Sequence, residues 1–183
     1  SRLGDAHVDP ALATDDPAAV GHADMVMVAV KLYDTDEAVR ACAPLVGPDS
    51  MVVSFQNGVT GGDALTAAFG PERVIGGTAA IAAMISAPGV ITHTGAIATI
   101  AFGEWDGIAS PRAEALLGAF ENAGVEATLA GDITAAIWSK FVFLSTFSAI
   151  TCALRLPIGP IREDPAHWSL FRRAMEETFA VAG

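Results

Sequence analysis

Short apolar runs alternate with helix-like segments in the first half of the chain, and this alternation limits the fold more than any other feature. Runs of strand length cover residues 25–30, 51–55 and 73–75. Residues 34–45 start with acidic side chains, which the helix dipole favours in a first turn, and residues 61–69 predict a second helix. Strands that alternate with helices are typical of a parallel sheet with right-handed crossovers. We therefore expect an α/β fold.

A long apolar segment over residues 137–158 dominates the second half and contains one lysine, Lys140, near its start. Burying an ammonium group is costly unless a partner satisfies it, so Lys140 either extends to water or is held for chemistry. On a helix, the residues within roughly 80° of Lys140 are Leu144, Ser148, Thr151 and Arg155. This partly polar stripe predicts that the helix faces a cleft or another polar group.

A membrane span is the competing interpretation of this segment, because it reaches the roughly 20 residues that a bilayer requires. Lys140, Arg155 and Pro157 inside it argue against contact with lipid on all sides. The hydrophobic fraction of 52% includes many alanines, and only 17% of the residues are charged. This composition favours a densely packed globular chain, and we expect no membrane partner.

The remaining segments predict elements of both kinds. We expect a tight turn at Gly76-Gly77-Thr78 and two antiparallel strands within 89–105 that are joined by a turn at Thr94-Gly95. Further along the chain we expect a helix over 111–123, a strand over 125–129, a turn at 157–160 and a final helix over 166–181. The pattern becomes entirely helical near residue 131. We therefore expect two domains, over residues 1–130 and 131–183.

Polar residues follow the predicted strands. Lys31, Asn57-Gly58 and the segment 78–83 each come after a strand. Because ligands bind beyond the carboxyl ends of parallel strands, we expect these residues to converge on one edge of the sheet. The alternative is that Asn57-Gly58 is only a turn and Lys31 only a solvated strand end.

The net charge, the cysteines and the histidines limit which partners, cellular compartment and metal sites we expect. A formal net charge of −11 disfavours nucleic acid, which needs a basic surface. Cys42 and Cys152 lie in apolar segments without metal or redox spacing, which favours a reduced, cytoplasmic protein. The four histidines are too scattered to predict a metal site.

Several motifs together resemble one family. They are Val30-Lys31 at a strand end, Gln56-Asn57-Gly58, Gly77-Thr78 leading to Ala82-Ala83, Trp138-Ser139-Lys140 at the start of the long helix, and Leu156-Pro157-Ile158-Gly159. In this order and spacing they resemble the ketopantoate reductases, NADPH-dependent enzymes with a Rossmann domain followed by a helical domain. The resemblance implies a partial Rossmann-type domain over residues 1–130 and the start of a helical substrate or dimerisation domain over 131–183.

The resemblance also implies an activity, the reduction of ketopantoate (2-dehydropantoate) to pantoate in pantothenate and coenzyme A biosynthesis. Lys140 matches the general acid that protonates the ketone oxygen, and Ser148 would lie with it at the substrate. Lys31, Asn57, Gly58 and Ala83 would lie against NADPH. The chemistry is consistent, because hydride addition develops negative charge on oxygen that a positioned ammonium stabilises and protonates. Desolvation would lower the pKa of such a lysine.

The chain also departs from the family pattern. It contains no G-x-G-x-x-G fingerprint and stops before the later helices that carry an active-site serine and glutamate, so we expect a piece of a longer polypeptide. Leu144, Ser148 and Ile158 stand where well-known members have asparagines. The alternatives are therefore a reductase of another 2-oxo acid, or a non-catalytic helical binding or dimerisation module. Alanine-rich helices with few charges suggest an interface, and so a homodimer.

Overall fold

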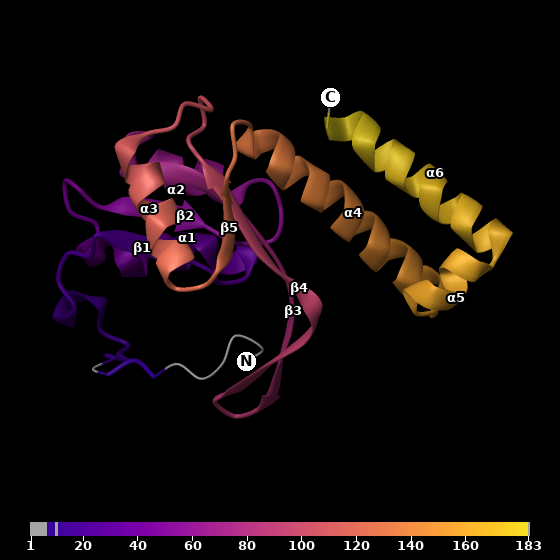
Figure 1. Cartoon of the computed structure of the whole chain (residues 1–183), viewed down its shortest axis with the longest axis horizontal. Helices are drawn as coiled ribbons and strands as arrows, with labels where there is room; N and C mark the ends of the chain where they lie inside the picture. Colours follow the sequence, from indigo (N-terminus) through magenta and orange to yellow (C-terminus); the bar gives the residue numbers. More distant parts are fainter. Residues whose placement is uncertain (1–6, 10, 183) are drawn as a thin grey trace. The chain divides into compact units, whose positions relative to one another are not determined.

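The computed structural model describes residues 7–9 and 11–182, and its contacts divide the chain into two compact units, residues 1–134 and 135–183. Figure 1 shows the elements of both units. The first unit contains the sheet, and the second consists of helices. An α/β part followed by a helical part is the fold class that the sequence predicted, and the prediction is confirmed.

Five strands form one mixed sheet in the first unit. The strands are β1 (Met25–Val28), β2 (Met51–Ser54), β3 (Val74–Ala87), β4 (Val90–Gly103) and β5 (Glu126–Leu129), and they lie in this order across the sheet. Neighbouring pairs are parallel except β3 and β4, which run antiparallel. The carboxyl ends of β1 and β2 therefore meet at the same edge.

Helices cover both faces of this sheet. They are α1 (Thr35–Cys42), α2 (Gly61–Phe69) and α3 (Pro111–Asn122), with short 3₁₀ turns η1 (Pro17–Ala19), η2 (Leu32–Asp34) and η3 (Ala43–Leu45). Val53 of β2 packs in a cluster with Ala113 and Leu116 of α3. The next residue back, Val52, packs in a second cluster with Leu65 of α2. This alternation between faces is what a strand buried on both sides requires.

Strand β1 differs from the prediction in length and burial. It ends at Val28 rather than residue 30, and Met27 is 45% exposed. The expectation that this strand is covered on both faces is therefore wrong at Met27. Val26 and Val28 point to the other face of β1, where they are buried in one cluster with Val52 and with Leu65 of α2.

The predicted turn at Gly76-Gly77-Thr78 is wrong, because these residues lie inside β3. Both glycines are buried in the strand for a packing reason. A Cβ on Gly76 would lie 2.6 Å from the Ile133 side chain, and one on Gly77 would lie 2.7 Å from Val53. Here glycine permits close approach rather than a change of chain direction.

The predicted break at Thr94-Gly95 is wrong as well. β4 is continuous through these residues, and the tight turn of the long β3–β4 hairpin comes earlier, between Ala87 and Val90 (Figure 1). Residues 94–97 instead form a bulge opposite Ala82, in which Gly95 has φ +83°. His93 Nε2 lies 3.1 Å from the Ile97 carbonyl oxygen across this bulge. Gly95 therefore lies in a bulge and not in a turn. The sequence alone does not distinguish these two reasons for a glycine within a strand pattern.

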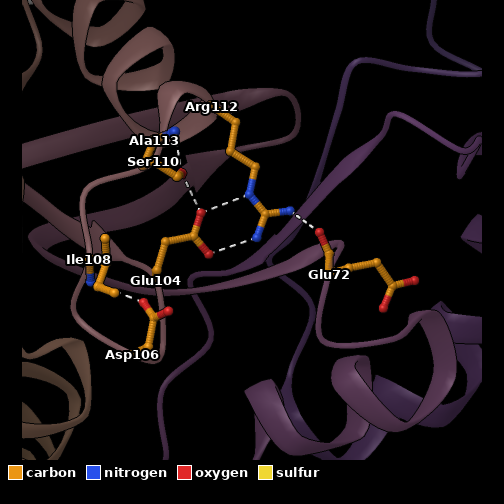
Figure 2. A network of polar contacts seen from close by, with 7 residues as sticks. All are labelled: Glu72, Glu104, Asp106, Ile108, Ser110, Arg112 and Ala113. Carbon is orange, nitrogen blue, oxygen red and sulfur yellow. Dashed lines mark hydrogen bonds and ion pairs between the residues drawn. The ribbon is translucent and has the colours of Figure 1, made fainter.

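A network of polar contacts joins the segment after β4 to the start of α3 and to the segment before β3 (Figure 2). Arg112 donates two hydrogen bonds to the Glu104 carboxylate, of 2.7 and 2.6 Å, and a further one to the Glu72 carbonyl oxygen. Ser110 donates to Glu104 and caps α3 by accepting from the Ala113 amide. The Arg112 guanidinium is the main cause that lowers the pKa of Glu104 below its usual value.

Replacing Arg112 with leucine should therefore lower the free energy of unfolding at neutral pH by about 1–2 kcal/mol, the range for charged hydrogen bonds at a partly exposed site. Because the pKa of Glu104 is lowered in the folded state, this stabilisation is present above the unfolded pKa near 4.5 and is lost as the pH falls through the folded value. Urea unfolding at pH 7 and at pH 3 measures both effects. Arg40→Leu, at an exposed arginine of α1, is the control, and an equal loss in both variants would contradict the role of the network.

The second unit consists of α4 (Ile133–Leu154), which starts at the boundary, α5 (Ile158–Glu163) and α6 (Pro165–Ala182). Ile150, Ile161 and Phe171, one from each helix, form its buried cluster. Trp168 stacks on Phe171 with ring centroids 5.2 Å apart. By length and composition α4 could also span a membrane, with a mean hydropathy of 1.5, and 22% of this apolar stretch is buried, including Thr146 and Ile150. A single helix of this kind is weak evidence for a membrane, because core helices of soluble proteins pass the same test.

The predicted turn at 157–160 is wrong, because the chain changes direction earlier, directly after α4, and residues 158–160 already belong to α5. Arg155 ends α4 with φ +52°, and two hydrogen bonds close the helix, from the Arg155 amide to the Cys152 carbonyl and from the Leu156 amide to the Thr151 carbonyl. Helix α5 then begins directly after Pro157. Its first turn tolerates the second proline at position 160 because first-turn amides have no partner inside the helix.

Arg155 is the one residue other than glycine with positive φ in the part of the chain that the structure describes. Arg155→Gly should raise the free energy of unfolding by about 1 kcal/mol, because glycine adopts this conformation without steric penalty. The thermal unfolding midpoint measures the gain. Arg155→Ala removes the same side chain but keeps the strained conformation, so a gain in the alanine variant would show that strain is not the cause.

Candidate active site

A pocket lies where β1 and β2 end. It has a volume of about 210 Å³ and is lined by Ala29, Val30, Lys31, Leu32, Phe55, Gln56 and Asn57. Lys31 directly precedes η2 after β1, and Asn57 comes three residues after the end of β2. The structure thus brings these two predicted residues to one pocket at the carboxyl edge of parallel strands, where ligands bind in such sheets.

Local hydrogen bonds fix the segment after β1. The buried Thr35 hydroxyl donates to the Leu32 carbonyl oxygen at 2.6 Å, and the Asp34 amide donates to the Lys31 carbonyl oxygen at 2.9 Å. These bonds fold the backbone at Lys31 into a short 3₁₀ turn that leads into α1. The Lys31 side chain itself is exposed, so its ammonium group is available to a ligand.

The backbone conformation and packing of Gly58 explain why a glycine follows Asn57. Its φ of +106° is one that other residues rarely adopt. A Cβ on Gly58 would also lie 2.9 Å from Leu32 Cδ2, so the segments after β1 and after β2 touch at this point. Asn57 is exposed beside this contact. The pair therefore bends the chain, in keeping with the alternative interpretation, and Asn57 also lines the pocket.

Gln56 is the residue of this site to which the sequence analysis assigned no role, although it is part of the Gln56-Asn57-Gly58 motif. It is only 8% exposed, and its side-chain amide donates to the Val30 carbonyl oxygen at 3.0 Å and to Thr35 Oγ1 at 2.9 Å. Its Oε1 accepts from the Ser54 hydroxyl at 3.0 Å. A glutamine after a strand matches no general structural pattern, so its place in the motif did not indicate what its side chain would contact.

The third predicted segment lies elsewhere. Residues 78–83 do not follow a strand end but continue β3, so that expectation is wrong. Ala83 pairs with His93 in the hairpin, is exposed, and does not line the pocket. β3 pairs with β2 only at Val74 and Ile75 and then with β4 alone, so residues 78–83 belong to the two-stranded β3–β4 hairpin and not to the segments that line the pocket.

Lys140 and Ser148 lie on α4 and belong to the second unit. Lys140 is half-buried, and desolvation by the surrounding atoms lowers the pKa of its ammonium group below the usual 10.5. Next to it, Phe141 meets Trp138 edge-on, with ring centroids 5.7 Å apart. Ser148 is exposed, two helical turns further along.

Comparisons with known proteins decide the family. One family model, described as ketopantoate reductase PanE/ApbA, matches residues 1–107, and the model of the C-terminal part of the same family matches residues 132–183. The chain belongs to the ketopantoate reductase family. The resemblance inferred from the sequence motifs is thereby confirmed.

Individual relatives agree with this assignment. A 2-dehydropantoate 2-reductase of Halobacterium salinarum is 32% identical over 173 residues, which make up 94% of this chain and 56% of the relative. The oxidoreductase YkpB of Bacillus subtilis, described as uncharacterized, is 34% identical over 141 residues, or 77% of this chain and 46% of the relative. A crystal structure of 2-dehydropantoate 2-reductase from Geobacter metallireducens superposes with a TM-score of 0.84 at 31% identity, covering 91% of this chain and 55% of that one.

The chain spans about half the length of the curated ketopantoate reductases it matches. Within that span, the pocket offers groups suited to a dinucleotide. Lys31 supplies a positive charge in a chain of net charge −11, and Asn57 supplies an exposed amide that can both donate and accept hydrogen bonds. A nicotinamide cofactor carries phosphates and a carboxamide, and these are the groups that an ammonium and an amide recognise.

Proposed function

We propose that the protein containing this chain is a ketopantoate reductase that uses NADPH to reduce 2-dehydropantoate to pantoate, for pantothenate and coenzyme A biosynthesis in the cytoplasm. The observation that carries the proposal is the shared pocket of Lys31 and Asn57 at the carboxyl edge of β1 and β2. The family assignment of both parts of the chain supports it. The proposed domains are a partial Rossmann-type domain over residues 1–130 and the start of a helical domain over 131–183.

In the proposed mechanism the bound nicotinamide supplies the hydride. Lys31, Asn57 and Gly58 hold the cofactor, and Ala83 is proposed to border it. Lys140 stabilises the developing oxyanion of the substrate and gives its proton to that oxygen. Burial of Lys140 favours this step, because a lowered pKa brings the ammonium closer to the working pH and makes it a better proton donor.

Substrate contacts are proposed for Lys140 and Ser148. A second candidate substrate, another branched 2-oxo acid, is favoured by the apolar, half-buried Leu144 and Ile158, which stand where well-known members of the family have asparagines. A homodimer is also proposed, since it would cover apolar side chains of the second unit such as Phe143 and Phe179, which are 51% and 66% exposed.

Oxidation of NADPH in the presence of ketopantoate, followed by the absorbance of the reduced cofactor with the full-length gene product, tests the function. We expect saturable turnover that depends on both substrates. Binding of NADPH without turnover of ketopantoate, but with turnover of another branched 2-oxo acid, would move the assignment to the second candidate. If neither NADPH nor NADH binds, the reductase proposal fails and the non-catalytic alternative replaces it.

Lys140→Met should lower kcat by about 100-fold or more, because it removes the general acid. Lys140→Arg should be similarly impaired, since a guanidinium keeps the charge but does not release a proton near neutral pH. In the unsubstituted enzyme kcat should fall as the pH rises through the pKa of Lys140. Because burial lowers that pKa, the fall should begin below 10.5, and it should be missing in Lys140→Met.

The matched control is Arg162→Met, which removes an exposed cation from the same helical unit and should leave kcat unchanged. Thermal unfolding separates chemistry from folding. Lys140→Met should keep a single cooperative unfolding transition, so that the loss of turnover reflects chemistry and not loss of the fold. Normal turnover in Lys140→Met would refute the assignment of the general acid.

A further inference from the structure

The structure assigns Gln56 as a positioning residue that sets the two walls of the pocket, the segment 30–35 after β1 and the segment 56–58 after β2. This inference rests on the proposed function, since it concerns how the cofactor site is held. Gln56 does not act on substrate. Its side chain fixes the backbone from which Lys31 and Asn57 project.

The backbone ladder between the two strands ends just before this point. The last paired residues are Val28 and Ser54, and one further backbone bond runs from the Phe55 amide to the Val28 carbonyl at 3.1 Å. Beyond it, the Gln56 side chain crosses between the segments in place of the ladder. Its amide nitrogen lies 3.0 Å from the Val30 carbonyl oxygen and 3.4 Å from that of Lys31.

The orientation of the Gln56 amide follows from its partners. Thr35 gives its hydroxyl proton to the Leu32 carbonyl oxygen, so towards Gln56 it can only accept. The Gln56 atom at 2.9 Å from Thr35 is therefore the nitrogen, which also suits the Val30 carbonyl. On the other side, the Gln56 oxygen accepts from Ser54. Both ends of the amide are used, which leaves one side-chain orientation.

Packing leaves little freedom at this connection. A Cβ on Gly61, at the start of α2, would lie 2.7 Å from Gln56 Oε1, so the helix backbone closes over the amide. Gly58 also lies close to Leu32, because a Cβ there would be 2.9 Å from Leu32 Cδ2. Buried hydrogen-bond networks that are fully satisfied hold their members in one arrangement. We expect Lys31 and Asn57 to keep a fixed spacing for this reason, and a cofactor bound between them to lose affinity when the amide is removed.

The test compares Gln56→Met with Ser50→Ala in the full-length gene product. Methionine keeps the length of the side chain but neither donates nor accepts as an amide does. Ser50 is an equally buried polar residue at the opposite end of β2, where its hydroxyl donates to the Ala23 carbonyl at 2.5 Å and accepts from the Gly47 amide at 2.8 Å. Both substitutions remove buried hydrogen bonds that join loops of the same sheet, but only Gln56 lies at the pocket.

In Gln56→Met we expect the dissociation constant and KM for NADPH to rise about 10-fold, with kcat at saturating NADPH within about 2-fold. In Ser50→Ala we expect a similar drop in the unfolding midpoint and an unchanged KM. Equal KM values in the two variants would overturn the positioning role. A loss confined to kcat would also overturn it, because that outcome would assign Gln56 to the chemical step.

Amide hydrogen exchange gives a readout that does not depend on cofactor. Gln56→Met should speed exchange at residues 32–35 relative to the rest of the sheet, and Ser50→Ala should not. Unchanged exchange at these amides would overturn the connection itself. If the unsubstituted protein binds no nicotinamide nucleotide, the proposed function fails, and the exchange result alone then decides whether Gln56 holds the two segments.

Discussion

The burial of β2 is the constraint on which the first unit depends. All four residues of this strand are buried, so its backbone amides and carbonyls have no access to water and must be paired by neighbouring strands. β1 and β3 both supply this pairing in parallel orientation. Parallel strands need helical crossovers, which α1 and α2 provide, and their carboxyl ends then lie at one edge. The pocket with Lys31 and Asn57 is a consequence of how β2 is buried.

β3 shows a second consequence of close packing. Its first two residues continue the parallel sheet, and from Gly76 onward it pairs with β4 instead. The change of partner occurs at two adjacent glycines whose missing side chains leave room for Ile133 and Val53. The same chain segment thus completes the buried sheet and begins an exposed hairpin. This change explains why residues 78–83 do not join the pocket that the sequence predicted for them.

The sequence predicted those features that depend on periodicity and on strand ends. The range of α2 was predicted to the residue, and the placement of Lys31 and Asn57 beyond β1 and β2 followed from the alternation of strands and helices. What it missed depends on tertiary contacts. Gly76 and Gly95 were both predicted to interrupt a strand, because the sequence alone does not distinguish a glycine required for close packing or for a bulge from one in a turn. The role of Gln56 was missed because its partners Val30 and Thr35 are 26 and 21 residues away along the chain.

The distribution of cations connects structure and proposed function. The chain has ten lysines and arginines, and only two of them, Lys31 and Lys140, are lysines. Arginine serves the structural contacts, as in the bidentate bond of Arg112 to Glu104 and the bonds of Arg73 to the carbonyl oxygens of Gly47 and Phe69. A guanidinium suits such contacts because it is planar and keeps its proton, whereas an ammonium can lose its proton once burial lowers its pKa. Lysine is therefore the residue that a proton-transfer step requires, and Lys140 is half-buried with its pKa lowered by desolvation. A chain that otherwise uses arginine has placed its two lysines at the two positions for which cofactor and proton chemistry are proposed.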